Sequence, residues 1–236
     1  MLEKILVLER ALFLRVNNCH SPFGDQFMWL YSGTFAWIPV VVCFFAVLFY
    51  ANRKRWKEML LAVAAIALTI TLCDQFSSGL CKPFFARFRP THHPDFMNDV
   101  MTVFDYRGGR YGFISSHAAN GFGFATLTSL IFRNKVYTVL LFLWATVFVY
   151  SRIYLGVHFI SDIIPGILTG LFFGWLVYRL FVFVHQKTFA GLPDRDTPYP
   201  CNGLTLILSV LVATVVIMAI ISMLSAYQLI PVLQIK

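Results

Sequence analysis

A histidine and an aspartate four residues apart stand between two long apolar runs. They are His158 and Asp162, in a stretch, Ser151–Asp162, that also carries Arg152. Ionisable groups are expensive to hold in hydrocarbon, so their presence at the end of an apolar run indicates a functional site. If the chain is helical from Phe159 onward, both side chains point from one face, and the carboxylate fixes the proton on one imidazole nitrogen. The other nitrogen is then available as a nucleophile or a base. A capping or packing pair is the alternative.

Two further groups of polar residues precede this stretch. Lys82 and Arg89 are seven residues apart and follow an apolar run, while Ser115, Ser116 and His117 stand before another one. Ser115 is predicted to cap a helix, and the first amides and positive dipole end of that helix would bind a phosphate. Alternatively, Lys82 and Arg89 are interface residues that extend their charges into water. Ser115 could likewise cap the helix without binding a ligand.

The composition indicates which elements must position these groups. The 236 residues are 58% hydrophobic and only 13% charged, with a mean hydropathy of +0.72, which predicts an integral membrane protein. The net charge of +8 does not indicate nucleic-acid binding, because the positive residues fall between apolar runs and form no nucleic-acid module. The five cysteines have neither metal-ligand spacing nor the pattern of a disulfide framework, although a bond between Cys19 and Cys81 stays conceivable.

Apolar runs of roughly bilayer-spanning length follow a charged N-terminal segment. We expect six, over Trp29–Tyr50, Met59–Leu80, Ala118–Phe132, Val136–Tyr150, Phe159–Val184 and Leu204–Leu224. Met1–Val16 is too charged for a cleavable signal peptide, and its apolar residues recur at helical spacing, so it is expected to be an interfacial helix or, alternatively, a simple tether. The predicted fold is an all-α membrane bundle of about six transmembrane helices with an N-terminal interfacial helix, in a single domain over residues 1–236.

Basic residues in the short loops predict the orientation of the bundle, since lysine and arginine favour the cytoplasmic side. They occur in the first, third and fifth loops, at Arg53, Lys54, Arg55, Lys57, Arg133, Lys135, Lys187 and Arg195. The second loop, from Cys81 to Ser115, and the fourth loop then lie together on the outer face, with both termini. The second loop is equally basic, which conflicts with the rule unless its cations bind an anion.

These residues resemble the type 2 phosphatidic acid phosphatase superfamily, which also includes bacterial vanadium haloperoxidases. The family's first motif, Lys-x6-Arg-Pro, is present as Lys82–Pro90, and its third, Ser-Arg-x5-His-x3-Asp, as Ser151–Asp162. Its second motif, Pro-Ser-Gly-His, is here Ile114–His117, which retains the serine and the histidine. Ser116 stands in place of the glycine and is expected to offer its backbone amide. The three motifs span residues 82–162.

The resemblance implies a phosphatase in which His158 attacks phosphorus and forms a phosphohistidine. Asp162 would orient His158, and His117 would protonate the departing lipid oxygen and then activate water. Three fixed cations can supply the charge that magnesium supplies elsewhere, so no metal and no other cofactor is expected. The residues implied to hold the phosphate are Lys82, Arg89, Ser115, Ser116 and Arg152.

The expected partners are the lipid bilayer and a lipid substrate with a terminal phosphate or pyrophosphate, with no nucleic acid and no obligatory protein partner. Undecaprenyl pyrophosphate, phosphatidylglycerol phosphate, phosphatidic acid and lipid A stay open, because these residues contact only the phosphate. The site is expected to face the outside of a bacterial inner membrane. A lipid phosphotransferase with the same intermediate is one alternative. A transporter is another, but it would show repeated halves and ionisable residues near mid-membrane.

Overall fold

The structure is a computed structural model that describes residues 2–51, 55–189 and 203–234. No strand is assigned among these residues, so the predicted all-α class is confirmed. A π-helical stretch over Gln75–Cys81 joins α4 to α5, and a second one over Val47–Ala51 extends α3. The helices are α1 (Leu2–Asn17), α2 (Pro22–Ser32), α3 (Ile38–Ala46), α4 (Trp56–Asp74), α5 (Lys82–Phe85), α6 (Ser116–Phe132), α7 (Lys135–Tyr154), α8 (Ile160–Thr188) and α9 (Leu204–Ala226).

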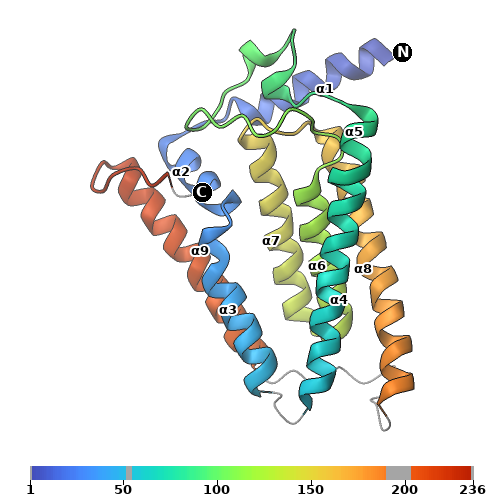
Figure 1. Cartoon of the computed structure of the whole chain (residues 1–236). Coiled ribbons are helices and arrows are strands. Elements are labelled where there is room, and N and C mark those ends of the chain that lie inside the picture. The colour runs from blue at the N-terminus through green and yellow to red at the C-terminus, as the bar shows by residue number, and fades with distance from the viewer. Residues whose placement is uncertain (1, 52–54, 190–202, 235–236) are drawn as a thin grey trace.

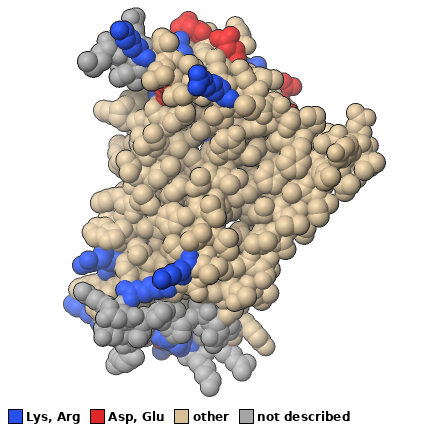
Figure 2. Space-filling model, turned by 180° about the vertical axis from the view of Figure 1, so that it is seen from behind, with Lys and Arg blue, Asp and Glu red and all other residues tan. Residues whose placement is uncertain are grey.

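The helices form a bundle with two different ends. Helices α4, α6, α7 and α8 run together, and α9 lies against α2 and α3 (Figure 1). The loop 86–115 and the turn between α7 and α8 share one end with α1, as predicted for the second and fourth loops (Figure 1). Lysine and arginine gather at the opposite end, whereas the α1 end shows both signs of charge (Figure 2). Of the basic residues used to predict orientation, Arg53, Lys54 and Arg195 lie outside the described residues.

Four helical segments of the described chain are long and apolar enough to cross a membrane. They are Trp56–Phe85, Lys135–Tyr154, Ile160–Thr188 and Leu204–Ala226, and a bent pair near the N-terminus makes a fifth if it counts as one span. The chain is therefore an integral membrane protein, but the predicted number of six spans is not confirmed. Helix α6, predicted as the third span, has only 17 residues and is largely buried among its neighbours.

The predicted first span, Trp29–Tyr50, is wrong as a single helix. The chain bends by 72° between α2 and the helical segment Phe35–Tyr50. Helix α2 ends at Ser32 because the Gly33 amide bonds back to carbonyl groups of its last turn, and a short 3-10 turn precedes α3. The bend leaves Ser32 at the end of the bundle where the predicted site residues lie.

Helix α8 touches α6 through a stripe of glycines, one on each turn. A Cβ added to any of them would lie 2.4 to 2.7 Å from a carbonyl oxygen at the start or in the first half of α6, so the two backbones meet directly. The amide of Ser115 also donates to the carbonyl oxygen of Asp162 at 2.9 Å. These contacts bring the start of α6 beside the start of α8. The glycines are Gly166, Gly170 and Gly174.

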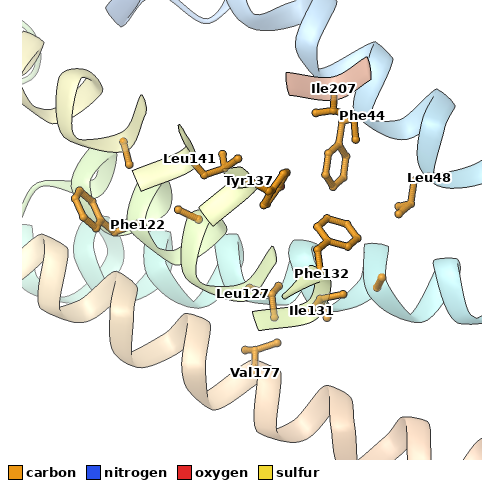
Figure 3. Packing of buried hydrophobic residues seen from close by; sticks show 14 of the residues in the cluster. Phe44, Leu48, Phe122, Leu127, Ile131, Phe132, Tyr137, Leu141, Val177 and Ile207 are labelled. Atoms are coloured by element: carbon orange, nitrogen blue, oxygen red, sulfur yellow. The ribbon is translucent and has the colours of Figure 1, made fainter. Parts of the chain in front are cut away.

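A cluster of apolar side chains fills the interior of the bundle, from the turn between α6 and α7 up to the first turns of α6 and α8. Phe132 and Tyr137, at the turn between α6 and α7, pack edge to face with ring centroids 5.2 Å apart, and Phe44 of α3 reaches Phe132 at 6.2 Å (Figure 3). Val177 of α8 and Ile207 of α9 close the cluster from the other sides (Figure 3). The cluster therefore joins the helices whose ends carry the site.

Helix α1 is docked onto the bundle, which excludes the alternative of a simple tether. Phe13 is fully buried, with its ring centroid 5.4 Å from that of Phe159. The Asn17 side chain donates to the carbonyl oxygens of Met101 and Tyr154, both at 3.0 Å, and accepts from the Met101 amide at 2.8 Å. Several apolar side chains of α1 stay exposed, as an interfacial helix requires: Leu6, Val7, Leu8 and Leu12.

Candidate active site

All the predicted site residues lie at the α1 end of the bundle, although they come from six segments of the chain. Each segment is the end of a helix or the loop next to one, so the packing of the helices determines where the side chains meet. The residues are Lys82 in α5, Arg89 in the following loop, Ser115, Ser116 and His117 at the start of α6, Arg152 in the last turn of α7, His158 in the α7–α8 turn and Asp162 in the first turn of α8.

His158 is a fully buried, neutral imidazole with a defined tautomer. Nη1 of Arg89 donates to its Nε2 at 3.1 Å, and because a guanidinium group can only donate, Nε2 must carry a lone pair. The ring proton then sits on Nδ1, which faces Asp162. Burial and the positive charges of Arg89, Arg152 and Lys82 hold the pKa of His158 well below its usual 6.5. The nitrogen with the lone pair therefore points toward the cations at neutral pH.

The structure corrects the geometry expected for His158 and Asp162. Helix α8 begins at Ile160 with Phe159 as its N-cap, so the two side chains do not project from one helix face. Oδ2 of Asp162 accepts from the Phe159 amide at 3.0 Å and lies 3.5 Å from Nδ1 of His158. Nδ1 makes no hydrogen bond to the carboxylate, and the backbone of Gly112 is the neighbouring group that favours the proton on the ring. The contact between the two residues is thus electrostatic, and the carboxylate also caps the helix.

A second carboxylate reaches Asp162 through an arginine that the sequence did not single out. Nη1 of Arg87 donates to Oδ1 of Asp162 at 2.8 Å and to the Ser161 hydroxyl at 2.5 Å, while Nη2 donates to Oε2 of Glu9 at 2.7 Å. Glu9 accepts in addition from the amide and the hydroxyl of Ser161. Helix α1 therefore supplies a side chain that caps α8 and holds the partner of Asp162.

Lys82 is held by two hydroxyl groups. Its Nζ donates to the Ser78 hydroxyl at 2.9 Å and to the Ser116 hydroxyl at 3.1 Å. Ser78 in turn donates to Oδ1 of Asp74 at 3.2 Å. Ser116, which was expected to contribute only its amide, thus uses its side chain as well, and a glycine at that position could not make this contact.

The start of α6 has the predicted geometry for binding an anion. Ser115 is the N-cap, as predicted, and its hydroxyl accepts from the Ala118 amide at 3.4 Å. The hydroxyl proton stays available to donate to a ligand. The amides of Ser116 and His117 lie in the first turn, where a helix offers them no carbonyl partner and presents its positive dipole end. His117 stands in the same turn, with its ring 5.5 Å from that of Phe148.

Arg152 and His117 line a common cavity of about 100 Å³. Arg152 is 2% exposed, and it donates from Nη1 to the Ser32 hydroxyl and from Nη2 to the Tyr106 hydroxyl, the latter at 3.2 Å. Its Nε has no hydrogen-bond partner among the described residues. Burial and the charge of Arg152 lower the pKa of Arg89 to about 10, so the Arg89 guanidinium group stays charged at neutral pH. Sequence reasoning missed Ser32 and Tyr106, which are ordinary residues in segments without a motif.

Two further expectations concern metals and disulfides. Over the described ranges, no group of three or more histidine, cysteine, aspartate or glutamate side chains is arranged to hold a metal ion. Cys19 and Cys81 are both free thiols, so the conceivable bond between them is not formed. Cys201 lies outside the described residues.

Comparison with known proteins identifies the family. The model of the PAP2 superfamily matches residues 58–186, which is more than half of the chain. The chain belongs to the PAP2 superfamily. The matched range contains all three motifs, so the family predicted from them is confirmed, together with the class of enzyme, a lipid phosphatase.

Two relatives match this PAP2 protein over most of their length. It is 48% identical over 186 residues to the lipid A 4'-phosphatase of Porphyromonas gingivalis, which covers 79% of this chain and 78% of the relative. It is 37% identical over 204 residues to the lipid A 4'-phosphatase of Bacteroides thetaiotaomicron, which covers 86% and 88%. The fold is similar to that of a transmembrane PAP2-type phosphatidylglycerolphosphate phosphatase from Bacillus subtilis, with a TM-score of 0.58, 19% identity, and coverage of 80% of this chain and 90% of that one.

Proposed function

We propose that this PAP2 protein removes a phosphate from lipid A through a phosphohistidine intermediate. The two relatives that carry a lipid A 4'-phosphatase name support the substrate class, since the similarity extends over most of each chain. The observation that carries the mechanism is the 3.1 Å contact between Nη1 of Arg89 and Nε2 of His158, which directs a lone pair at the group of cations.

In the first step, Nε2 of His158 attacks phosphorus while the bond from phosphorus to the lipid oxygen breaks. Burial and the neighbouring cations lower the pKa of His117, and the negative charge of the bound phosphate opposes this effect, so His117 takes up a proton as the substrate binds. His117, which lines the same cavity as Arg152, then gives that proton to the departing oxygen, and the lipid leaves as a neutral alcohol. The imidazole of His158 becomes positively charged as the new bond forms. The carboxylate of Asp162, 3.5 Å from Nδ1, stabilises that charge.

In the second step, the now neutral His117 accepts a proton from a water molecule. The water oxygen attacks phosphorus, the bond to Nε2 breaks, and inorganic phosphate leaves. Throughout, the charges of Lys82, Arg89 and Arg152 neutralise the equatorial phosphate oxygens, with donors from the start of α6. Phosphoryl transfer depends mainly on such positioning and neutralisation.

We also infer the orientation of the protein from its charges. The end of the bundle opposite the site carries the gathered lysines and arginines and would face the cytoplasm, so the site would face the periplasm of a bacterial inner membrane. Residues 1–236 would form one catalytic domain, which the apolar cluster shared by α3, α4, α6, α7, α8 and α9 supports. No protein partner would be required.

The test is phosphate release by the purified protein from lipid A, undecaprenyl pyrophosphate, phosphatidylglycerol phosphate and phosphatidic acid, each in the same detergent. Lipid A should be the best substrate, and His158→Ala should lower its turnover by at least about 10³-fold because the nucleophile is lost. His92→Ala, a histidine of the loop, is the matched control. Wild-type turnover by His158→Ala would refute the nucleophile, and a preference for another lipid would refute the substrate.

A further inference from the structure

An open cavity adjoins the candidate active site on the side of the long loop. Its volume is about 510 Å³, within the range that holds a small organic ligand. It shares two of its lining residues, Trp29 and Tyr106, with the smaller cavity of His117 and Arg152. The two cavities are therefore adjacent, with these two side chains at their common border.

One wall of the open cavity is built from aromatic rings. Trp29 packs edge to face against Phe104 and Tyr106, with ring centroids 5.3 and 5.5 Å away. Trp29 is 7% exposed and belongs to a buried cluster with the α7–α8 turn, so the wall has a firm support. Aromatic rings offer a large apolar surface of defined geometry, against which the C–H face of a ring-shaped ligand can pack.

The remaining lining is polar and consists of Asp105, Arg107 and two glycines. Asp105 is exposed, and both it and Phe104 have positive φ angles, of 54° and 51°. Side chains rarely adopt this left-handed conformation, and it tends to persist at functional sites. The turn is closed by the Tyr106 amide, which donates to the Val103 carbonyl oxygen at 3.0 Å. The turn presents a carboxylate beside the aromatic wall.

The same loop touches two of the predicted phosphate ligands. The Tyr106 hydroxyl accepts from Nη2 of Arg152 at 3.2 Å. Gly108 has a φ of +66°, and a Cβ there would lie 3.2 Å from Nη1 of Arg89. The loop therefore packs closely on both guanidinium groups, and its cavity stands at a fixed position relative to the phosphate.

We propose that this cavity binds the sugar ring that carries the phosphate to be removed, with Asp105 accepting hydrogen bonds from ring hydroxyl or amide groups. The inference rests on the proposed function and names the residues that select the substrate. In a prenyl pyrophosphate the group next to the terminal phosphate is a second phosphate, which suits Arg107 but is repelled by the Asp105 carboxylate. A glycerol backbone has no ring face for the aromatic wall. A phosphorylated sugar offers a ring face to the aromatic wall and hydroxyl groups to the polar side chains.

The first test compares the selectivity of wild type and Asp105→Asn, a replacement that also tolerates the left-handed turn. The ratio of kcat/KM for lipid A to that for phosphatidic acid should fall about tenfold, as expected when a hydrogen bond to a charged group is lost. Asp99→Asn, a carboxylate in the same loop outside the cavity, should keep the wild-type ratio. An unchanged ratio in Asp105→Asn would overturn the assignment of the cavity while leaving lipid A as the substrate.

The second test does not depend on turnover of lipid A. Glucosamine 6-phosphate and glycerol 3-phosphate, which carry the same phosphate monoester, are compared as inhibitors of phosphate release from whichever lipid the wild type hydrolyses best. The sugar phosphate should inhibit at lower concentration, and Asp105→Asn should remove most of that difference. Equal inhibition of the wild type by both compounds would overturn the proposal. Failure of the wild type to hydrolyse lipid A, with the difference between the inhibitors intact, would overturn the substrate alone.

Discussion

Glu9 of α1 and Asp162 of α8 bind the same guanidinium group, that of Arg87, at 2.7 and 2.8 Å. Asp162 is fully buried, whereas Glu9 and Arg87 keep 11% and 27% of their side-chain surface exposed. A helix at the edge of the bundle is thereby joined to the carboxylate beside the proposed nucleophile. Helix α1 has a direct route by which its docking can affect catalysis.

Glu9→Gln should lower kcat about tenfold with little change in KM, an effect typical of lost outer-shell contacts. The amide keeps the size of the side chain but removes the charge that Arg87 and the Ser161 amide share, so Asp162 is held less well. Arg15→Gln, an exposed position of the same helix, is the control. Steady-state kinetics on the best lipid substrate measure both constants. A value of kcat equal to that of the control would contradict a positioning role for Glu9.

Replacing Arg89 by a neutral residue should shift the acid limb of the pH profile of kcat/KM. In the wild type, nearby positive charges and burial keep the pKa of His158 well below 6.5, so the nucleophile stays neutral below that pH. Arg89→Gln removes the nearest charge and should raise this pKa, shifting the acid limb of kcat/KM to higher pH in a profile from about pH 4 to 8. The overall rate should also fall, because Arg89 is a proposed phosphate ligand. An unmoved acid limb would show that another group controls it.

The same lowered pKa has a consequence for stability. Folding disfavours the protonated form of His158, so the unfolded chain binds the additional proton more readily. The contribution of His158 to the free energy of unfolding is therefore complete above about pH 6.5 and is lost as the pH falls toward its folded pKa. Thermal unfolding followed across this range should show the decline, and His158→Asn should reduce it. If the variant lost as much stability at low pH as the wild type, a group other than His158 would be responsible.

Gly170→Ala should destabilise the protein and inactivate it. The new Cβ would lie 2.4 Å from the Ala119 carbonyl oxygen and 2.8 Å from the Gly123 amide nitrogen, both backbone atoms, so α6 and α8 would have to separate. We expect a loss of about 1–3 kcal/mol in the free energy of unfolding. Gly121→Ala is the matched control, because its Cβ would meet the Phe148 side chain at an ordinary 3.6 Å. The measurement is the thermal unfolding temperature in detergent. Equal unfolding temperatures for the two variants would refute the close contact.

Chelation should leave the activity unchanged. The charges of Lys82, Arg89 and Arg152 all act on His158, so they lie around the place where the phosphate is expected. They can neutralise it as a metal ion does in other phosphoryl-transfer enzymes. Phosphate release is measured after dialysis against excess chelator. Loss of activity that added magnesium restores would overturn this prediction.

The sequence indicated which residues would gather at one end of the bundle, because each is a polar group in a chain that is otherwise apolar; their roles in binding and catalysis stay predictions. Ser115 was also placed correctly as a helix cap, since capping depends on neighbours along the chain. Arg87, Glu9 and Ser32 were missed because their roles depend on partners in distant segments. Nothing local distinguishes Arg87 from an interface arginine.

The fold was predicted less completely, for reasons that differ between the helices. The apolar content from Trp29 onward suggested one span, but hydropathy carries no information on the bend after Ser32. The start of α8 was placed too early because the turn before it, with Gly156 at a φ of +76°, keeps His158 out of the helix. The glycines of α8 were readable from their spacing of four residues, which typically marks a close helix contact in membranes.

That spacing has a consequence for the register of the two helices. Glycines repeated on every turn would accept α6 almost equally well after a slip of four residues, roughly 6 Å along the axis. The stripe therefore sets the distance between the helices and leaves their longitudinal alignment undetermined. The hydrogen bond from the Ser115 amide to the Asp162 carbonyl oxygen favours one of these alignments. This backbone contact between the starts of α6 and α8 thus helps to keep the two histidines of the proposed reaction level with each other.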